Sequence, residues 1–135
     1  MNAETLRRGD YDLITKEVIG AAIEVHKELG PGLLESVYEV CLMKELRLRN
    51  IRAERQVRLP VIYKGEDLSK EFYIDILVED IIILELKCVE VILPVHEVQL
   101  VTYLKLADKR LGLLLNFNVP KMIQGIKRKV NNLNE

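Results

Sequence analysis

The chain of 135 residues is 49% hydrophobic and 30% charged, a composition typical of a folded globular protein and not of a disordered one. We expect a single domain over residues 1–135, with residues 1–11 as a flexible N-terminal segment. No apolar run approaches the roughly 18–20 residues of a membrane span, and the N-terminus lacks a signal region, so we expect a cytoplasmic protein. Cys41 and Cys88 lie in apolar segments as buried thiols, which argues against a disulfide framework or a zinc motif.

Charge is distributed unevenly along the chain, although the net charge is only −1. Residues 44–58 hold six basic and two acidic side chains, residues 66–90 hold eight acidic and two basic ones, and residues 105–129 hold seven basic and one acidic. Two basic stretches around an acidic one could form a patch beside a cation site. Solvated helix faces and strand edges explain the same pattern without a function, and charge alone favours that reading.

The first half of the chain predicts two helices and a strand. Helical spacing of apolar residues indicates a helix over 12–29, ended by Gly30, and a second from about 33 to 49. The stretch "RAERQVRLPVIYKG" alternates polar and apolar residues, as a half-buried strand does, and Pro60 places it at a sheet edge or at a bulge. "KGEDLSK" is typical of a hairpin turn.

The second half predicts three further strands and one helix, with a last strand less sharply marked. "EFYIDILV" and "IIILELKC" are apolar strands joined at Glu79-Asp80, followed by a helix over 95–108 and the fully apolar strand "RLGLLLNFN". "MIQGIKRKV" fits a helix or a strand, and its alternation favours the strand. The order α-α-β-β-β-α-β-β indicates an α/β fold with a mixed sheet flanked by helices.

Three charged residues, Asp75, Glu85 and Lys87, stand inside the two apolar strands. Glu85 and Lys87 are two residues apart, so they point to one face of the sheet, while Leu84, Leu86 and Cys88 point to the other. A two-residue loop would set Asp75 against Leu84, with the two carboxylates on opposite faces. A third loop residue or a bulge would set it against Glu85. We expect the second register because of the chemistry that it allows, since no glycine marks the turn.

Two carboxylates a few ångströms apart repel each other, and without a cation one of them tends to keep its proton. Oxygen ligands with no His or Cys nearby favour Mg²⁺ or Mn²⁺ over Zn²⁺. Lys87 could orient a metal-activated water or stabilise charge on a scissile phosphate. The pattern therefore predicts metal-assisted phosphodiester hydrolysis. The alternative is an ion pair of Lys87 with one acid and no metal, but buried acids without a partner are costly.

The pattern D-x₉-E-x-K on adjacent strands, followed by a helix, resembles the core of the PD-(D/E)XK nuclease superfamily. Gly32, Glu35 and Tyr38 fit the G-x-x-E-x-x-Y signature in "GPGLLESVYEVCLMKEL". "LPVIYKG", "IDILV", "LELKCV", "HEVQLVTYLK" and "LGLLLNF" follow in the order seen in the GxxExxY subfamily. This resemblance covers residues 12 to 130. It implies a restriction-endonuclease-like core, Mg²⁺ dependence and nuclease activity, but no particular substrate.

The resemblance also implies roles for individual residues. Asp75, Glu85 and the carbonyl of Leu86 would be metal ligands, Lys87 would be the catalytic lysine, and Glu35 and Gln99 would be helix residues that complete the catalytic set. Relatives often carry an arginine two residues before the hairpin aspartate, where this chain has Tyr73.

Ordinary structural explanations exist for the helical residues. Glu35 suits the first turn of any helix, Gln99 is a common exposed helix former, and His96 is a first-turn surface residue. Tyr38 and Tyr103 fit the core or its rim. Only their place in the matched sequence pattern favours a catalytic role for Glu35 and Gln99 over these structural explanations.

We therefore expect a nuclease that uses Mg²⁺ or Mn²⁺ and acts on nucleic acid, on DNA more than RNA. A homodimer would supply a second site for the other strand. Two other functions stay open, namely a non-catalytic nucleic-acid-binding or structural protein with the same fold, and a hydrolase of a small phosphoester. The residues expected to guide the phosphate backbone are Arg47, Arg49, Lys105 and Lys109.

Overall fold

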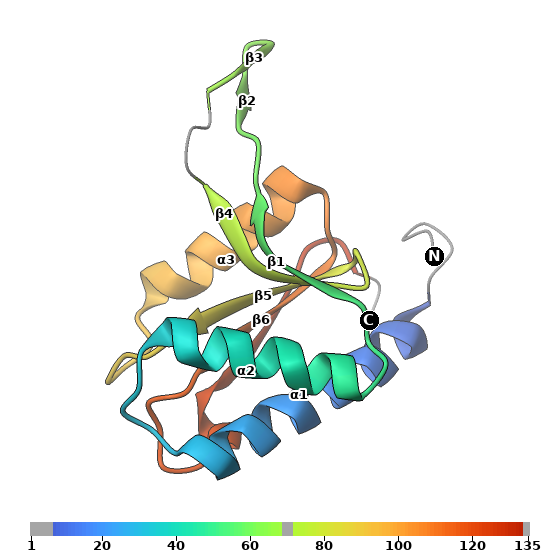
Figure 1. The fold of residues 1–135 in the computed structure, drawn as a ribbon. Helices are drawn as coiled ribbons and strands as arrows, with labels where there is room; N and C mark the ends of the chain where they lie inside the picture. The colour runs from blue at the N-terminus through green and yellow to red at the C-terminus, as the bar shows by residue number, and fades with distance from the viewer. Residues whose placement is uncertain (1–6, 69–71, 134–135) are drawn as a thin grey trace.

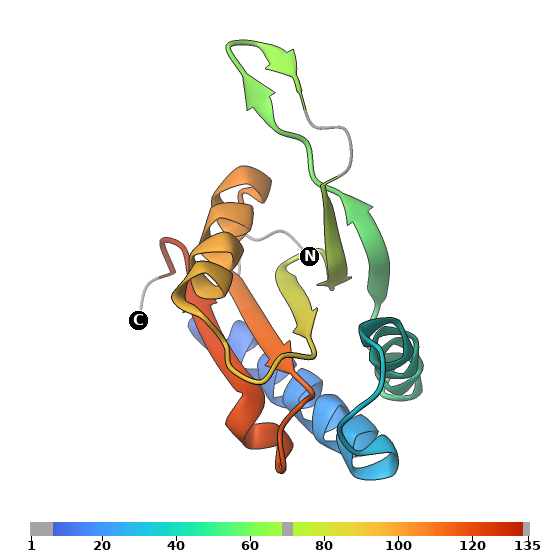
Figure 2. The same cartoon turned by 90° about the vertical axis from the view of Figure 1, so that its left-hand side faces the viewer.

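A computed structural model describes residues 7–68 and 72–133 of the chain and shows a five-stranded sheet with helices on both faces (Figures 1 and 2). The α/β class with a mixed sheet is therefore confirmed. In chain order the elements are α1 (Arg8–Leu29), α2 (Glu35–Leu48), β1 (Ala53–Arg58), β2 (Ile62–Tyr63), β3 (Glu66–Asp67), β4 (Tyr73–Val78), β5 (Ile82–Lys87), α3 (Pro94–Ala107), β6 (Leu111–Asn116), the 3₁₀ helix η2 (Met122–Gly125) and β7 (Ile126–Val130).

The strands of the main sheet follow the order β1-β4-β5-β6-β7. Only β5 and β6 pair in parallel, because α3 carries the chain back between them, and the other neighbours pair antiparallel. All six residues of β6 are buried, as its apolar sequence predicts for a strand covered on both faces. Residues 122–130 form η2 and the strand β7. The strand predicted from the alternation of polar and apolar residues is therefore found at residues 126–130.

Two apolar cores, one on each face of the sheet, fix the direction of the side chains of β5. Leu84 and Leu86 pack in the core that includes residues of α1 and α2, whereas Ile83 packs in the core beneath α3. Glu85 and Lys87 share the parity of Ile83, so they lie on the α3 face, as strand parity predicts.

The first helix begins at Arg8, four residues earlier than its apolar spacing predicts. The side chain of Tyr11 is 1% exposed and belongs to the core, and Asp10 accepts a hydrogen bond from the backbone N–H of Arg7 at 3.0 Å. Residues 8–11 are therefore not part of a flexible segment, because Tyr11 anchors the first turn. Residues 1–6 lie outside the described residues.

The loop between β4 and β5 has three residues. It gives the expected register, in which Asp75 lies across from Glu85. Glu79 and Asp80 both have positive φ, 50° and 59°, and Ile81 donates its N–H to the carbonyl of Val78 at 2.9 Å. This is the pattern of a type I′ turn with one extra residue, the buried Ile81. Val78 therefore pairs with Ile82 and Ile76 with Leu84.

The strand expected over residues 52–65 is divided by Pro60. Its first part, β1, is an edge strand of the main sheet, as Pro60 suggested, and its second part pairs with β3 in a separate small hairpin. This hairpin projects from the body of the protein (Figures 1 and 2). We call the described residues 58–68 and 72–73 the arm.

Both strands at the root of the arm are kinked. Gln56 has a φ of 53°, and the β1–β4 ladder skips the position where it would face Asp75. Ile74 and Leu77 both pack beneath α3, although three residues along a regular strand separate opposite faces. The kink at Asp75 therefore turns the arm relative to the sheet.

No helix among the described residues is both long enough and apolar enough to cross a membrane. Cys41 and Cys88 are free thiols and are half-buried, where the sequence predicted buried ones.

Gly125 is the glycine where a methyl group would do most harm. A Cβ there would lie 2.0 Å from the carbonyl oxygen of Asn116, so the backbone itself must move. We expect Gly125→Ala to lower the free energy of unfolding by about 2–3 kcal/mol, measured by urea denaturation.

The matched control is Gly9→Ala, at a helical position where a Cβ meets nothing within 4 Å. It should leave stability unchanged or raise it by up to about 1 kcal/mol. Equal behaviour of the two variants would contradict the close packing of η2 on β6.

Candidate functional site

Asp75 and Glu85 face each other at the point where β4 and β5 separate. The β4–β5 ladder ends at Ile76 and Leu84, and the same register sets Asp75 across from Glu85. The backbone N–H of Asp75 donates to Glu85 Oε1 at 3.4 Å, and the N–H of Leu86 donates to Asp75 Oδ2 at 2.9 Å. Side-chain oxygens thus accept these backbone hydrogens, and the two strands run apart beyond this point (Figure 1).

Glu85 is the electrostatically strained member of this pair. Glu85 is 9% exposed. Its burial, together with the charge of Asp75, raises the pKa of Glu85 to about 9, and the positive charge of Lys87 lowers this pKa by a smaller amount. A neutral Glu85 or a cation shared by both acids relieves the repulsion. At neutral pH the metal-free protein therefore holds one proton on this pair.

The donor set fits a small hard cation. In an extended residue the N–H and C=O point to the same side, so the carbonyl of Leu86 points toward Asp75, as its N–H does. Within residues 7–68 and 72–133, no group of three or more His, Cys, Asp and Glu side chains is placed to hold a metal. Two carboxylates and a carbonyl suit Mg²⁺ or Mn²⁺, which bind through one or two carboxylates and keep several waters, and do not suit Zn²⁺.

Lys87 lies at the end of β5, on the same face as Glu85, and is half-buried. Asn116, its neighbour in β6, is buried among apolar residues and bonds the backbone that follows Lys87. The Asn116 amide accepts from the N–H of Val89 at 3.1 Å and donates to its carbonyl at 2.9 Å, while Phe117 N–H donates to the carbonyl of Lys87 at 3.0 Å. These bonds fix the strand end that carries Lys87. Sequence reasoning missed Asn116, although an amide inside "LLLNFN" was a visible signal.

Glu35 is the first residue of α2 and is exposed. Burial, followed by the charge of Glu35, raises the pKa of the Cys88 thiol to about 11, which places that charge near the residue after Lys87. Tyr38, fully buried, holds the start of the helix in place. Its hydroxyl donates to the carbonyl of Gly30 at 2.5 Å and accepts from the N–H of Leu33 at 3.2 Å.

Helix α3 brings Tyr103 to the acid pair. Burial, then the charges of Glu85 and Asp75, raise the pKa of Tyr103, so its hydroxyl lies within electrostatic reach of the two carboxylates. Gln99 Nε2 donates to Tyr103 Oη at 3.1 Å. Gln99 is exposed and reaches the acids only through this tyrosine, which sequence reasoning placed in the core or its rim. The spacing of four residues from Gln99 was the available signal.

His96 has a local structural role. Its Nδ1 accepts the N–H of Leu93 at 3.0 Å and so caps the first turn of α3. This agrees with its reading as a first-turn residue.

Glu39 holds the kink of β1 that faces Asp75. Its carboxylate, 8% exposed, accepts from Arg55 Nε at 3.1 Å and from Gln56 Nε2 at 3.0 and 3.1 Å. These bonds stabilise the positive φ of Gln56, a conformation that costs a non-glycine residue about 1–2 kcal/mol. Sequence reasoning identified none of these three residues.

The four basic residues expected to guide a phosphate backbone do not form one patch with the acids. Arg47 and Arg49 stand at the end of α2 on one face of the sheet, and Lys105 and Lys109 at the end of α3 on the other. Arg49 is paired with Glu17 at 3.1 Å and Glu45 at 3.8 Å, and Lys109 with Asp80 at 3.4 Å.

Tyr73, at the position of the expected arginine, pairs with Arg58 across the ladder. A guanidinium therefore stands next to the position, in the neighbouring strand. Its NH2 group bonds both oxygens of Asp67, at 3.0 and 3.1 Å.

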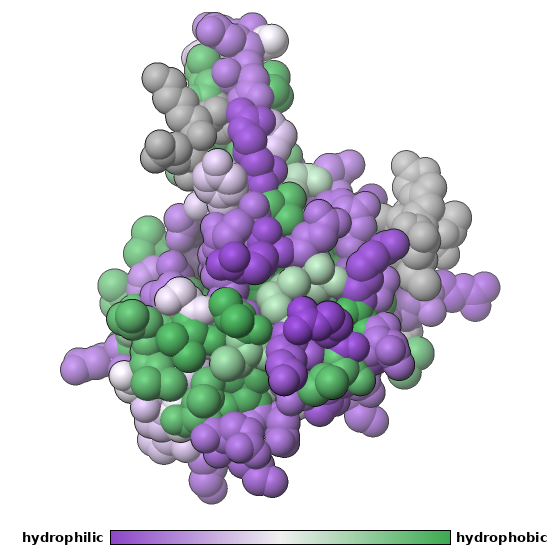
Figure 3. All heavy atoms as spheres, viewed as in Figure 1, coloured by the Kyte–Doolittle hydropathy of each residue, from purple (hydrophilic) through white to green (hydrophobic). Residues whose placement is uncertain are grey.

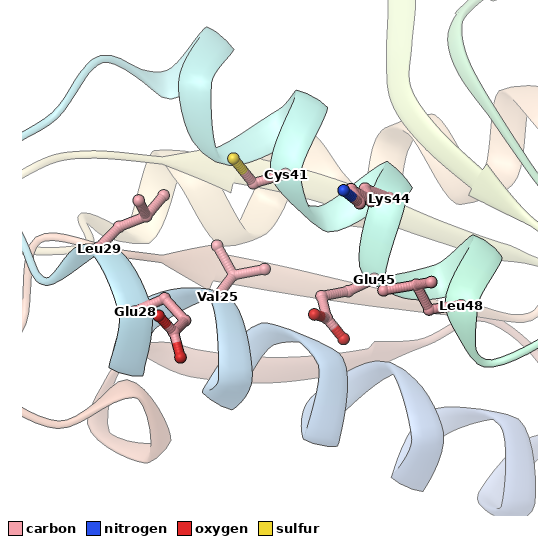
Figure 4. Close-up of a pocket in the computed structure, with 7 residues that line it drawn as sticks. All are labelled: Val25, Glu28, Leu29, Cys41, Lys44, Glu45 and Leu48. Atoms are coloured by element: carbon pink, nitrogen blue, oxygen red, sulfur yellow. The ribbon is translucent and has the colours of Figure 1, made fainter.

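A hollow of about 330 Å³ lies between α1 and α2, away from the acids (Figure 4). Its walls are mainly apolar, and none of the residues expected at the active site lines it. The lining residues are Val25, Glu28, Leu29, Cys41, Lys44, Glu45 and Leu48.

The protonation of Glu85 predicts an unusual pH dependence of stability in EDTA. Below the ordinary carboxyl pKa both folded and unfolded chains hold the proton, and above about pH 9 both have lost it. Between these limits only the folded chain holds it, so the free energy of unfolding falls as pH rises, by up to about 1.4 kcal/mol per unit from this group. Urea denaturation from pH 5 to 9 measures the slope.

Glu85→Gln removes the titrating group and should flatten the slope, leaving the variant about 2–4 kcal/mol more stable than the unaltered protein at pH 8. Glu54→Gln, on the exposed part of β1, is the matched control and should keep the original slope. The same slope in all three proteins would contradict a protonated Glu85.

Comparison with known proteins agrees with this geometry. The family model of the PD-(D/E)XK nuclease superfamily matches residues 12–129. Searches among curated proteins and among solved structures returned no significant match. The matched segment covers both acids, the lysine, the helices on either side and nearly the whole chain, and the chain belongs to the PD-(D/E)XK nuclease superfamily.

Proposed function

We propose that this protein is a nuclease of the GxxExxY type that hydrolyses phosphodiester bonds with the help of Mg²⁺ or Mn²⁺, residues 1–135 acting as one domain. The observation that carries the proposal is the pair Asp75 and Glu85, facing each other where two strands separate, with Lys87 on the same face. An acid pair that a cation would relieve, beside a lysine, has the parts needed for phosphodiester hydrolysis.

Each residue of this group has a separate task. Asp75, Glu85 and the carbonyl of Leu86 would hold the cation, which when bound polarises the phosphate and lowers the pKa of a water. Lys87 donates a hydrogen bond to the attacking water or to the phosphate oxygen on which charge develops. Asn116 fixes the backbone at the strand end from which the Lys87 side chain extends.

Glu35 and Gln99 complete the proposed set from two helices. Glu35 lies close enough to Cys88 for its charge to raise the pKa of that thiol, and it would approach the site from the end of β5. Gln99 acts through Tyr103, since its amide bonds the hydroxyl that lies within electrostatic reach of the acids.

The proposed substrate is DNA in preference to RNA, and the proposed location is the cytoplasm. Arg47, Arg49, Lys105 and Lys109 would guide the phosphate backbone, and Arg49 and Lys109 would first exchange their present carboxylate partners for phosphates. Because such exchange weakens electrostatic binding, we expect one chain to hold duplex DNA only loosely.

A non-catalytic binding protein is the second candidate. The arginine expected at Tyr73 is missing, and the guanidinium in the neighbouring strand is bonded to Asp67. Both observations lower the capacity to hold a phosphate beside the acids, and turnover decides between the two candidates.

Replacing the lysine tests the enzyme. We expect Lys87→Ala to lower the rate of DNA cleavage in Mg²⁺ or Mn²⁺ by about 10²–10⁴-fold, because a charge next to the reacting phosphate is lost. Single-stranded, duplex and branched DNA and RNA are assayed in parallel. Lys16→Ala, an exposed lysine of α1, is the matched control and should cleave at the original rate.

Cleavage that Lys87→Ala leaves unchanged would place the activity elsewhere or in a contaminant. Absence of cleavage on all substrates, with no heat of Mg²⁺ or Mn²⁺ binding by calorimetry, would leave the binding protein as the function.

We also propose a homodimer formed through α2. Its outward side chains Leu34, Val37 and Val40 are exposed, and apolar atoms gather over this helix (Figure 3). The adjoining hollow carries Lys44 together with Glu28 and Glu45, so a two-fold copy would bring opposite charges together.

Light scattering should give the mass of a dimer for the unaltered protein and of a monomer for Val40→Glu. Val40 is 55% exposed, so a charge there is tolerated in the monomer, whereas it would be costly when buried in a dry interface. Leu13→Glu, at a residue of α1 that is 68% exposed, is the control and should remain a dimer. A monomer in all three samples would contradict the proposal.

A further inference from the structure

The arm exposes aromatic and aliphatic side chains far from any core. Tyr63 near its tip is 58% exposed, and Phe72 and Tyr73 at its root are 49% and 41% exposed. Ile62 and Leu68 are exposed as well, while Leu59 alone is anchored, at 1% exposure beneath α3. Figure 3 shows the arm standing clear of the body, with apolar groups among its polar ones. Exposed apolar side chains gathered in one projecting segment are a candidate surface for binding a partner.

The arm is built onto the strand that carries the candidate active site. Tyr73 is the first residue of β4 and lies two residues, or about 7 Å, before Asp75. From Arg58 to Tyr63 the chain can extend up to about 18 Å, so Tyr63 stands within a few nucleotide lengths of the acids. The kink at Asp75, held by Glu39 through Gln56, sets the direction of this extension. The arm therefore begins within about 7 Å of the acid pair along β4.

The charge of the arm limits what it can bind. Its described residues hold two bases, Arg58 and Lys64, and two acids, Glu66 and Asp67. Arg58 and Asp67 bond each other, so the arm has no excess of positive charge with which to grip a duplex. Stacking on the faces of unpaired bases needs no net charge. The ammonium of Lys64 lies over one face of the Tyr63 ring, 5.4 Å from the ring centre, so a base would stack on the opposite face.

We propose that the arm binds single-stranded nucleic acid by stacking unpaired bases on Tyr63 and Tyr73. The arm thereby gives the site a preference for unpaired strands over duplex. This specificity rests on the proposed nuclease function, whereas the binding itself does not.

The test is fluorescence anisotropy in EDTA with a labelled twelve-nucleotide oligothymidylate and with a duplex of the same length. Tyr63→Leu and Tyr73→Leu keep an apolar side chain but remove the ring, and we expect each to raise the Kd for the single strand about 5- to 100-fold. Tyr63→Phe and Tyr73→Phe keep the ring and should bind as the unaltered protein does. The Kd for the duplex should not change in any variant. Leu13→Ala, an exposed apolar residue of α1, is the control for a general loss of apolar surface.

Four outcomes overturn the inference. The unaltered protein does not bind the single strand, or the leucine variants bind it as tightly as the unaltered protein does. Alternatively, the leucine variants lose as much affinity for the duplex as for the single strand, or the phenylalanine variants lose as much affinity for the single strand as the leucine variants do. If the leucine variants instead lose binding to lipid vesicles or to a second copy while oligonucleotide binding persists, the arm serves that partner and the inference is wrong.

The experiments distinguish a wrong inference about the arm from a wrong proposal of nuclease activity. Cleavage that depends on Lys87 but is indifferent to Tyr63 and Tyr73 would support the nuclease and overturn the arm. Ring-dependent binding of the single strand without Lys87-dependent cleavage would support the arm and overturn the nuclease.

Discussion

Two carboxylates share one small space at the end of the β4–β5 ladder, and much of the surrounding structure follows from the need to place them there. Asp75 and Glu85 accept backbone hydrogens that would otherwise pair strand with strand. The price is the repulsion that raises the pKa of Glu85 to about 9. The repulsion within an acid pair of this kind falls when a proton or a cation compensates one of the two charges.

Several interactions outside the acids keep this arrangement rigid. Asn116 holds the backbone after Lys87, Tyr38 holds the start of the helix that carries Glu35, and Glu39 holds the kink of β1. All three are polar groups in otherwise apolar surroundings with their hydrogen bonds satisfied, which is the condition under which buried polar groups add rigidity. Tyr38 also stacks on Phe117 at 4.5 Å between ring centres, which ties α2 to the end of β6. The acids, the lysine and Glu35 are therefore carried by elements that are fixed to one another.

The outside of the protein shows a different balance. Basic side chains on both faces are engaged by acids, and the net charge is close to zero, so long-range attraction of a polyanion is weak. Among the described residues, exposed apolar side chains are found on the outer side of α2 and on the arm. A protein that recognises its substrate through stacking and shape depends less on salt than one that relies on phosphate contacts.

The sequence by itself determined the α/β class, the buried character of β6 and the common face of Glu85 and Lys87, because apolar periodicity and strand parity are local properties. The register that sets Asp75 against Glu85 was expected only from the chemistry of a metal site. It depends on Ile81 as an extra loop residue and on positive φ at Glu79 and Asp80. The turn contains no glycine, so its sequence does not predict this conformation. Only the tertiary structure brought Tyr103 and Asn116 to the site, since they arrive from α3 and β6 by packing. It alone also separated the arm from β1, because a kink at Gln56 is held by Glu39, seventeen residues away, and no local pattern encodes that contact.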